Sequence, residues 1–150
     1  MRWLILSMFV VTAACASSDS KTGTDGKRHK ALELPLEEWT IDENGVNYSE
    51  GDRTDWKKFE VPRQGPVVVE LLIDRPSATI NVALFDSRGK LIKEGNNRLG
   101  KDRATLRLEA EASQGICFLQ IFARGSGDHS VYSTRITLGG PGGEYIPPPE

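Results

Sequence analysis

Short apolar segments separated by turn residues run through most of this chain. Residues 67–73 read VVVELLI and lie between two turn sequences, PRQGP and DRP. Residues 78–85 alternate in polarity and place Ile80, Val82 and Leu84 on one face. Runs of this length that are rich in β-branched residues and bounded by Gly, Pro and Asp are typical of strands. This pattern restricts the chain to a fold that is built from sheets.

The same pattern continues on both sides of these two segments. We expect further strands at residues 59–61, 90–94, 104–108, 115–122 and 131–138, and one or two more within 34–41 and 46–48. The segment 115–122 is the most apolar, so we place it at the centre of a sheet. The sequence DSRG at 86–89 predicts a hairpin turn in which Gly89 can take a positive φ. Residues 103–112 could be mistaken for a helix, but no segment carries a convincing helical apolar stripe. About seven or eight short strands predict an all-β fold, a single jelly-roll-like antiparallel β-sandwich.

The N-terminal residues have the pattern of a secretion signal. Arg2 precedes an apolar run at residues 3–11, and the small residues TAA lead directly to Cys15. The run is too short to span a bilayer, which takes roughly 20 apolar residues. The stretch resembles a bacterial lipoprotein signal, in which the cysteine at the cut site is lipidated and becomes the first mature residue; Thr12 stands where that family prefers Leu. The alternatives are an ordinary signal cleaved nearby, which leaves a soluble secreted protein, and an uncleaved anchor.

The lipoprotein resemblance implies a membrane location. Such an anchor carries several acyl chains, and two or more chains hold a protein firmly because each buried methylene contributes about 0.8 kcal/mol. Ala16 rather than Asp follows Cys15. By similarity to the sorting rule of Gram-negative lipoproteins, this favours the outer membrane. We therefore expect a lipid-anchored protein of the cell envelope, with the membrane face unassigned.

Composition divides the chain into four parts. They are a signal peptide (1–14), a lipidated cysteine with a flexible tether (15–32), a β-sandwich domain (33–138) and a Gly/Pro-rich tail (139–150). Residues 16–31 contain no large apolar side chain, so they cannot offset the entropy lost on ordering. The basic sequence KRHK at 27–30 is expected to be solvated, and contact with anionic headgroups is the alternative.

The charge of the chain argues against a nucleic-acid partner, and its cysteine content argues against an internal disulfide. The formal net charge is −2, and removal of the signal peptide takes away only Arg2 and leaves −3, which argues against a nucleic-acid partner. The chain has two cysteines, Cys15 and Cys117. A lipidated Cys15 cannot form a disulfide with Cys117, so we expect Cys117 to be an inert thiol buried in an apolar strand.

Five motifs occur in an order that resembles the bacterial pre-peptidase C-terminal domain. They are GDRTDWKKF at 51–59, the apolar segment at 67–73, ALFDSRG at 83–89, GICFLQI at 115–121 and GDHSVY at 127–132. The resemblance covers about residues 45–138, with Cys117 where the family usually has Tyr. It implies a jelly-roll-like sandwich that is accessory to secreted hydrolases, binds surfaces or polymers or stabilises its host, and is not catalytic. The collagen-binding domains of clostridial collagenases are similar.

Asp52 and Asp55 are the candidate metal ligands. Two carboxylates three residues apart at the irregular start of a strand can point toward one cation, and Ca²⁺ takes about 6–8 oxygens. In the collagen-binding relatives the matching pair helps to hold Ca²⁺, so the resemblance implies the same ion here. More oxygens could come from Asp42, Glu43, Asn44, Asn47 and Glu50. The alternative is that Asp52 and Asp55 accept hydrogen bonds from backbone N–H groups in the turn before Trp56.

Aromatic residues follow this acidic pair. We expect Trp56 and Phe59 to be core or half-buried sheet residues. A role of Trp56 as a platform for sugar binding is the alternative.

Catalysis is not expected. Asp128, His129 and Ser130 have the residue types of a hydrolytic triad, but adjacent residues cannot take its geometry, in which the side chains converge from different elements. The sequence contains no HExxH, no CxxC and no Gly-rich phosphate loop before a helix. We therefore predict that the protein is not an enzyme and has no catalytic residues.

The predicted function follows from the anchor and the fold. We expect a membrane-anchored, non-catalytic accessory lipoprotein whose β-sandwich contacts an envelope protein or an extracellular polymer. One alternative is a Ca²⁺-dependent module that binds polysaccharide or fibrous protein. A further alternative is an accessory subunit of a secreted hydrolase.

Overall fold

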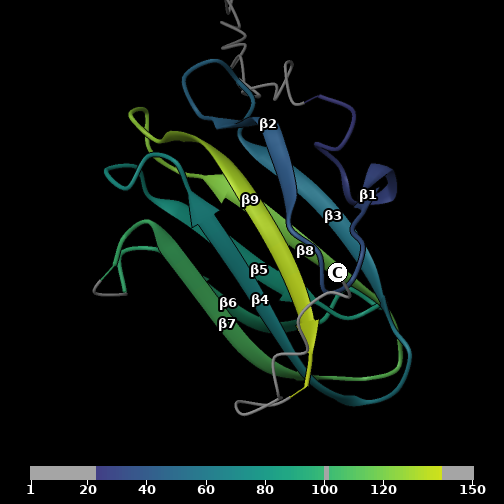
Figure 1. The fold of residues 1–150 in the computed structure, drawn as a ribbon. Coiled ribbons are helices and arrows are strands. Elements are labelled where there is room, and N and C mark those ends of the chain that lie inside the picture. Colours follow the sequence, from purple (N-terminus) through teal and green to yellow (C-terminus); the bar gives the residue numbers. More distant parts are fainter. Residues whose placement is uncertain (1–22, 100–101, 140–150) are drawn as a thin grey trace, which may run out of the picture.

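The computed structural model describes residues 23–99 and 102–139; the predicted signal peptide, Cys15 and tail residues 140–150 lie outside this part. Its strands form two sheets that face each other (Figure 1). The strands are β1 (Leu32–Glu33), β2 (Thr40–Asn47), β3 (Thr54–Val61), β4 (Gly65–Ile73), β5 (Ile80–Phe85), β6 (Leu91–Asn96), β7 (Thr105–Ala112), β8 (Gly115–Ala123) and β9 (His129–Leu138). A short 3₁₀ helix, η1 (Arg28–Lys30), precedes them.

The strand order confirms the predicted all-β sandwich. The five-stranded sheet has the order β1-β3-β8-β5-β6, and the four-stranded sheet has the order β2-β9-β4-β7. All of these pairs are antiparallel except β1 with β3. The described ranges contain nine strands rather than the predicted seven or eight, because the two-residue β1 adds to the edge of β3. The strand β8 is central in its sheet, as its apolar sequence predicts.

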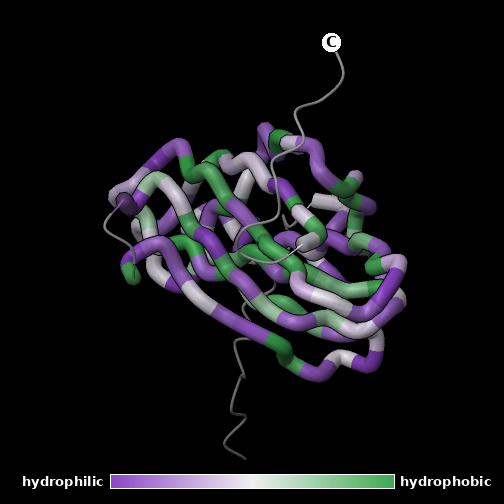
Figure 2. Tube along the Cα trace, turned by 60° about the horizontal axis from the view of Figure 1, so that its bottom comes forward, coloured by the Kyte–Doolittle hydropathy of each residue, from purple (hydrophilic) through white to green (hydrophobic). Residues whose placement is uncertain are grey.

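Alternating side chains build the core between the sheets. Val67, Val69 and Leu71 of β4 are fully buried, as are Leu119 and Ile121 of β8. Figure 2 shows hydrophobic and hydrophilic residues interleaved along the strands. Each such buried side chain contributes about 1.5–3 kcal/mol relative to its exposure to water. The period of two that predicted the strands is therefore also the period that fills the core.

The edge strand β2 contains a bulge that matters for the site. Asp42 pairs with Tyr132 and Val46 pairs with Ser130, so β2 has two more residues than β9 across this interval. Gly45 has a φ of 58°, and a Cβ atom there would collide with the backbone carbonyl of Ser130. The bulge therefore requires glycine at this position.

The N-terminal strap, residues 23–31, differs from the flexible tether that the sequence predicted. The backbone carbonyl of Asp25 accepts a hydrogen bond of 2.8 Å from the N–H of Trp56. The guanidinium carbon of Arg28 lies 4.3 Å from the centre of the Phe118 ring. The strap thus packs on the five-stranded sheet through polar and cation–π contacts, which the composition argument did not count.

Other local predictions are confirmed. Asp86 Oδ1 accepts hydrogen bonds from the N–H groups of Arg88 and Lys90 in the β5–β6 hairpin, where Gly89 has a φ of 88°. Residues 103–112 contribute to β7 and are not helical. Across the described ranges 23–99 and 102–139, no helix is long and apolar enough to cross a membrane.

Substitution of Cys117 tests the orientation of the central strand. Cys117 is 2 % exposed, and burial raises the pKa of its thiol. We expect Cys117→Asp to destabilise the domain by several kcal/mol, because an unpaired carboxylate would be buried. Ile116→Asp is the matched control, since Ile116 is 46 % exposed on the other face of β8. Thermal denaturation measures both; an equal loss in the two variants would contradict the assignment.

Candidate functional site: an acidic cleft between the two sheets

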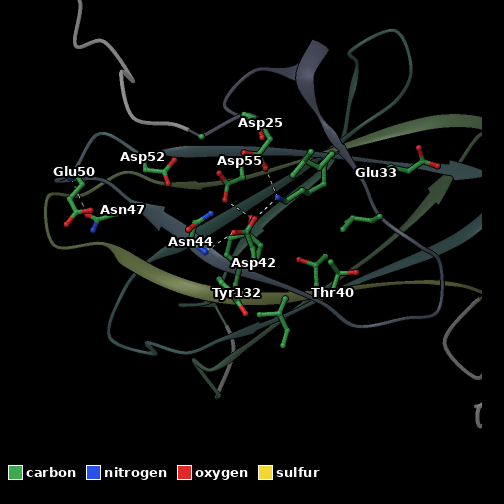
Figure 3. Close-up of a pocket in the computed structure, with 18 residues that line it drawn as sticks. Asp25, Glu33, Thr40, Asp42, Asn44, Asn47, Glu50, Asp52, Asp55 and Tyr132 are labelled. Atoms are coloured by element: carbon green, nitrogen blue, oxygen red, sulfur yellow. Dashed lines mark hydrogen bonds and ion pairs between the residues drawn. The ribbon is translucent and has the colours of Figure 1, made fainter.

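A cleft of about 760 Å³ opens where the edge strand β2 faces β1 and β3 of the other sheet. Three carboxylates converge there, from Asp25 of the strap, Asp42 of β2 and Asp55 of β3 (Figure 3). One oxygen of each lies within 4.8 Å of the others. Segments far apart in the sequence therefore assemble a compact acidic group.

Lys57 provides the cation inside this group. The alternation of β3 turns Asp55, Lys57 and Phe59 to the same interior face. Lys57 Nζ lies 2.5 Å from an oxygen of Asp25 and 2.5 Å from an oxygen of Asp42, and the residue is 4 % exposed. Burial by itself would lower the pKa of Lys57, but the hydrogen bonds to the two carboxylates raise it above its usual value. Lys57 thus stays charged and joins the strap to β2.

Tyr132 links the remaining carboxylate to this ion pair. Its hydroxyl lies 2.6 Å from Asp55 Oδ2 and 3.2 Å from Asp42 Oδ2. One hydroxyl proton cannot be donated to both oxygens at the same time. A proton on Asp55 resolves this conflict, because the resulting O–H can donate to the Tyr132 oxygen while Tyr132 donates to Asp42.

The pKa values agree with this arrangement. Burial, with the negative charges of Asp25 and Asp42, raises the pKa of Asp55 to about 8, although Tyr132 and Lys57 oppose the shift. Burial also acts to raise the pKa of Asp42, but hydrogen bonds from Lys57 and from the N–H of Gly45 leave it below the usual value. The pKa values of the two carboxylates that share the Tyr132 hydroxyl are therefore shifted in opposite directions.

Asp52 lies in the same cleft but outside the group of three. Its backbone forms an isolated antiparallel bridge with Asn47, two residues before β3 begins. Burial and the charges of Asp25 and Asp42 raise the pKa of its carboxyl to about 6. Its Oδ1 atom is buried and has no hydrogen-bond partner among the described residues.

Thr134 of β9 supplies a second polar atom without a partner. The residue is 2 % exposed and lines the cleft, and its Oγ1 atom makes no hydrogen bond within the described part of the chain. Leaving a buried polar atom unpaired costs about 1–3 kcal/mol. Both buried side-chain atoms of this kind line the same cleft, so unused hydrogen-bonding capacity is concentrated there.

The structure brings the predicted oxygen donors together. Asp52 and Asp55 line the cleft with five others that the sequence suggested, namely Asp42, Glu43, Asn44, Asn47 and Glu50. In Figure 3 Asn47, Glu50 and Asp52 lie toward one end of the cleft, and Glu33 lies toward the other. The carboxylates of Asp52 and Asp55 accept no hydrogen bond from a backbone N–H in the described ranges, so the alternative role in the turn is not observed.

Trp56 lies apart from the cleft. Because neighbours along a strand face opposite sides, its ring is on the outer face of the five-stranded sheet. Trp56 is half-buried there, in agreement with the prediction of a core or half-buried sheet residue. Its ring centre lies 5.5 Å from that of Phe85. The structure therefore does not combine Trp56 with Asp52 and Asp55 in one site.

The three adjacent residues with triad chemistry have separate partners. Asp128 Oδ1 accepts a hydrogen bond of 2.7 Å from the N–H of Thr79. His129 Nδ1 lies 3.2 Å from a nitrogen of Arg75, and the Ser130 hydroxyl donates to the carbonyl of Val131. These contacts hold the turn and do not form a catalytic relay.

Comparisons with known proteins support the fold. No protein-family model matches the sequence, and no curated protein matches it. The structure is similar to the pre-peptidase C-terminal domain of a collagenase from Bacillus anthracis, with a TM-score of 0.57 and 15% identity over 71% of this chain and 93% of that chain. This similarity confirms, at the level of the fold, the resemblance that the five motifs predicted.

Two other similarities are weaker. A mitogen from Yersinia pseudotuberculosis gives a TM-score of 0.44 at 14% identity over 72% of this chain and 92% of that chain. A family 35 carbohydrate-binding module, solved in complex with a disaccharide that contains glucuronic acid, gives 0.44 at 14% identity over 80% of this chain and 85% of that chain.

The raised pKa of Asp55 predicts a pH dependence of stability. The pKa is about 8 in the folded chain against an ordinary value of 3.8, so between these values the folded state binds more protons than the unfolded state. The free energy of unfolding should then fall as the pH rises, by up to about 1.4 kcal/mol per pH unit for one such group. Urea denaturation between about pH 5 and pH 8 measures this slope.

Two variants show whether Asp55 is the source. Asp55→Asn should flatten the slope and leave only the smaller part from Asp52. Glu60→Gln, a change at an exposed position of the same strand, should keep the slope of the wild type. A wild-type slope in Asp55→Asn would contradict the assignment.

Proposed function

We propose that this protein is a non-catalytic binding module, held on a membrane of the cell envelope by lipidated Cys15, whose acidic cleft binds a cation. The observation that carries the proposal is the content of the cleft. Four aspartates line it, namely Asp25, Asp42, Asp52 and Asp55. Among the residues that the structure describes, Lys57 is the one lysine or arginine in the lining. Charge and unused oxygen atoms therefore favour a positively charged ligand.

The charge balance of the cleft explains why a second cation would be stabilising. Lys57 compensates the two carboxylates that it contacts, Asp25 and Asp42. Among the described residues, Asp52 and Asp55 make no ion pair of this kind, and the pKa of each is raised. A bound cation would favour their charged forms and would replace the protons that they otherwise retain.

The chemistry of the donors favours Ca²⁺. Hard carboxylate and amide oxygens are the ligands that Ca²⁺ prefers, and it accepts irregular sets of about 6–8 of them. Asp52 and Asp55 would hold the ion with help from Asn44, Asn47 or Glu50, which line the same cleft. The ion would link β2 to β3 and could present a surface to an extracellular polymer or an envelope protein.

Calcium titration tests the cleft. We expect CaCl₂ to raise the melting temperature of the mature chain (residues 15–150), because a ligand that binds only the folded state stabilises it by about 2.7 kcal/mol at 100 times its Kd. The double variant Asp52→Asn/Asp55→Asn should lose this shift and still fold, as judged by circular dichroism. Glu60→Gln, which leaves the cleft unchanged, should keep it. A wild type without a shift at millimolar Ca²⁺, or a double variant that keeps the shift, would refute the proposal.

Mass spectrometry of the membrane-extracted protein tests the anchor. We expect the mature chain to begin at Cys15 and to carry the added mass of acyl chains, because a cysteine follows the apolar signal directly. Cys15→Ser should remain unmodified and, unlike the acylated chain, should be washed from membranes by 1 M salt. An unmodified N-terminus at another residue would refute the anchor without affecting the proposal for the cleft.

A further inference from the structure

The strap presents positive charge in a fixed position. Arg28 points toward the outer face of the five-stranded sheet, where its guanidinium lies against the ring of Phe118. Its neighbours Lys27, His29 and Lys30 are exposed. Arg28 fixes the short helix η1, so these side chains belong to an ordered segment. The sequence predicted a flexible one.

Arg28 also connects the strap to the β5–β6 hairpin. Its side chain donates hydrogen bonds of 2.7 Å to the carbonyl of Ser87 and 3.3 Å to the carbonyl of Asp86. Exposed Arg88 and Lys90 follow directly in the same turn. Two basic segments that are distant in the sequence thus lie side by side.

We name the cations of these two segments, Lys27, Arg28, Lys30, Arg88 and Lys90, the basic patch. Asp86 is the acidic residue within the same turn, and its carboxylate faces the backbone N–H groups of Arg88 and Lys90. The patch is strongly positive on a chain whose formal net charge is −2. Positive charge therefore concentrates on the strap and hairpin, while four aspartates gather in the cleft.

We propose that the basic patch docks on an anionic lipid bilayer, namely the membrane that holds the chain. This inference rests on the anchored state proposed above. Lys27 follows Cys15 by twelve residues, a distance of at most roughly 40 Å even for an extended chain. A lipidated Cys15 would therefore keep the patch near the headgroups. Each Lys or Arg near an anionic surface contributes about 1 kcal/mol, a roughly five-fold change in partition.

Docking would also give the domain an orientation. Phe118 faces outward from the five-stranded sheet, because its neighbours Cys117 and Leu119 are the buried ones. The strap and hairpin meet over this outer face, at Phe118. The five-stranded sheet would then face the bilayer, and the four-stranded sheet would face away from it.

Vesicle binding of the mature chain with Cys15→Ser tests the patch without any contribution from lipid. We expect co-sedimentation with vesicles that contain phosphatidylglycerol, little with pure phosphatidylcholine, and release near 1 M salt, where the screening length is about 3 Å. The variant Lys27→Gln/Lys30→Gln/Arg88→Gln/Lys90→Gln should bind about 600-fold more weakly, a roughly five-fold loss for each of the four cations. Arg28 is left unchanged because it holds the strap.

The control removes four exposed arginines outside the patch, in Arg63→Gln/Arg98→Gln/Arg103→Gln/Arg107→Gln. It has the same net charge as the first variant and should bind close to the wild type. Equal loss in both variants would show attraction to overall charge only and would overturn the proposal. Equal binding to neutral and anionic vesicles, or a patch variant that binds like the wild type, would also overturn it. None of these results depends on lipidation, so the anchor is tested separately.

Discussion

The rest of the site depends on the ion pairs that a charged lysine forms inside the β-sandwich. The alternation of β3 places Lys57 on the interior face, where Phe59 belongs to the core. Its ammonium group needs anionic partners, and it obtains them from Asp25 of the strap and Asp42 of β2. Such a buried pair does not have to add stability beyond that of an apolar substitute, but loss of one partner leaves the other charge uncompensated. The strap, β2 and β3 are therefore held by one shared cation.

Much of the fold could be predicted because its signals are local. Period-two alternation and turn residues predict the strands and the β5–β6 hairpin. The apolar sequence of β8 predicts its central position in the sheet. The ordered strap could not be predicted, because a segment without large apolar residues is expected to be flexible. Arg28 attaches the strap to the ring of Phe118 and to the backbone carbonyl of Ser87. These partners lie about ninety and about sixty residues after Arg28 in the sequence. No local pattern in the sequence reveals such a contact.

The candidate site was predictable in part for the same reason. The spacing of Asp52 and Asp55 predicts neighbouring carboxylates just before and within β3, and the residues suggested as further donors line the same cleft. Lys57 could have been found by extending the alternation back from Phe59. Asp25 could not, because only the packed strap brings it to β3. Trp56 is adjacent to Asp55 in sequence, yet the strand separates their side chains onto opposite faces.

The bulge in β2 has a consequence for how the cleft can respond to its contents. Asp42 Oδ1 is engaged by the N–H groups of Asn44 and Gly45, which leaves Oδ2 for Lys57 and Tyr132. Two main-chain N–H groups and two side chains thereby hold the carboxylate in one orientation. We therefore expect a change of charge in the cleft to alter the protonation of Asp52 and Asp55 before it moves the Asp42 side chain. The pKa values of these two carboxyl groups are raised to about 6 and about 8.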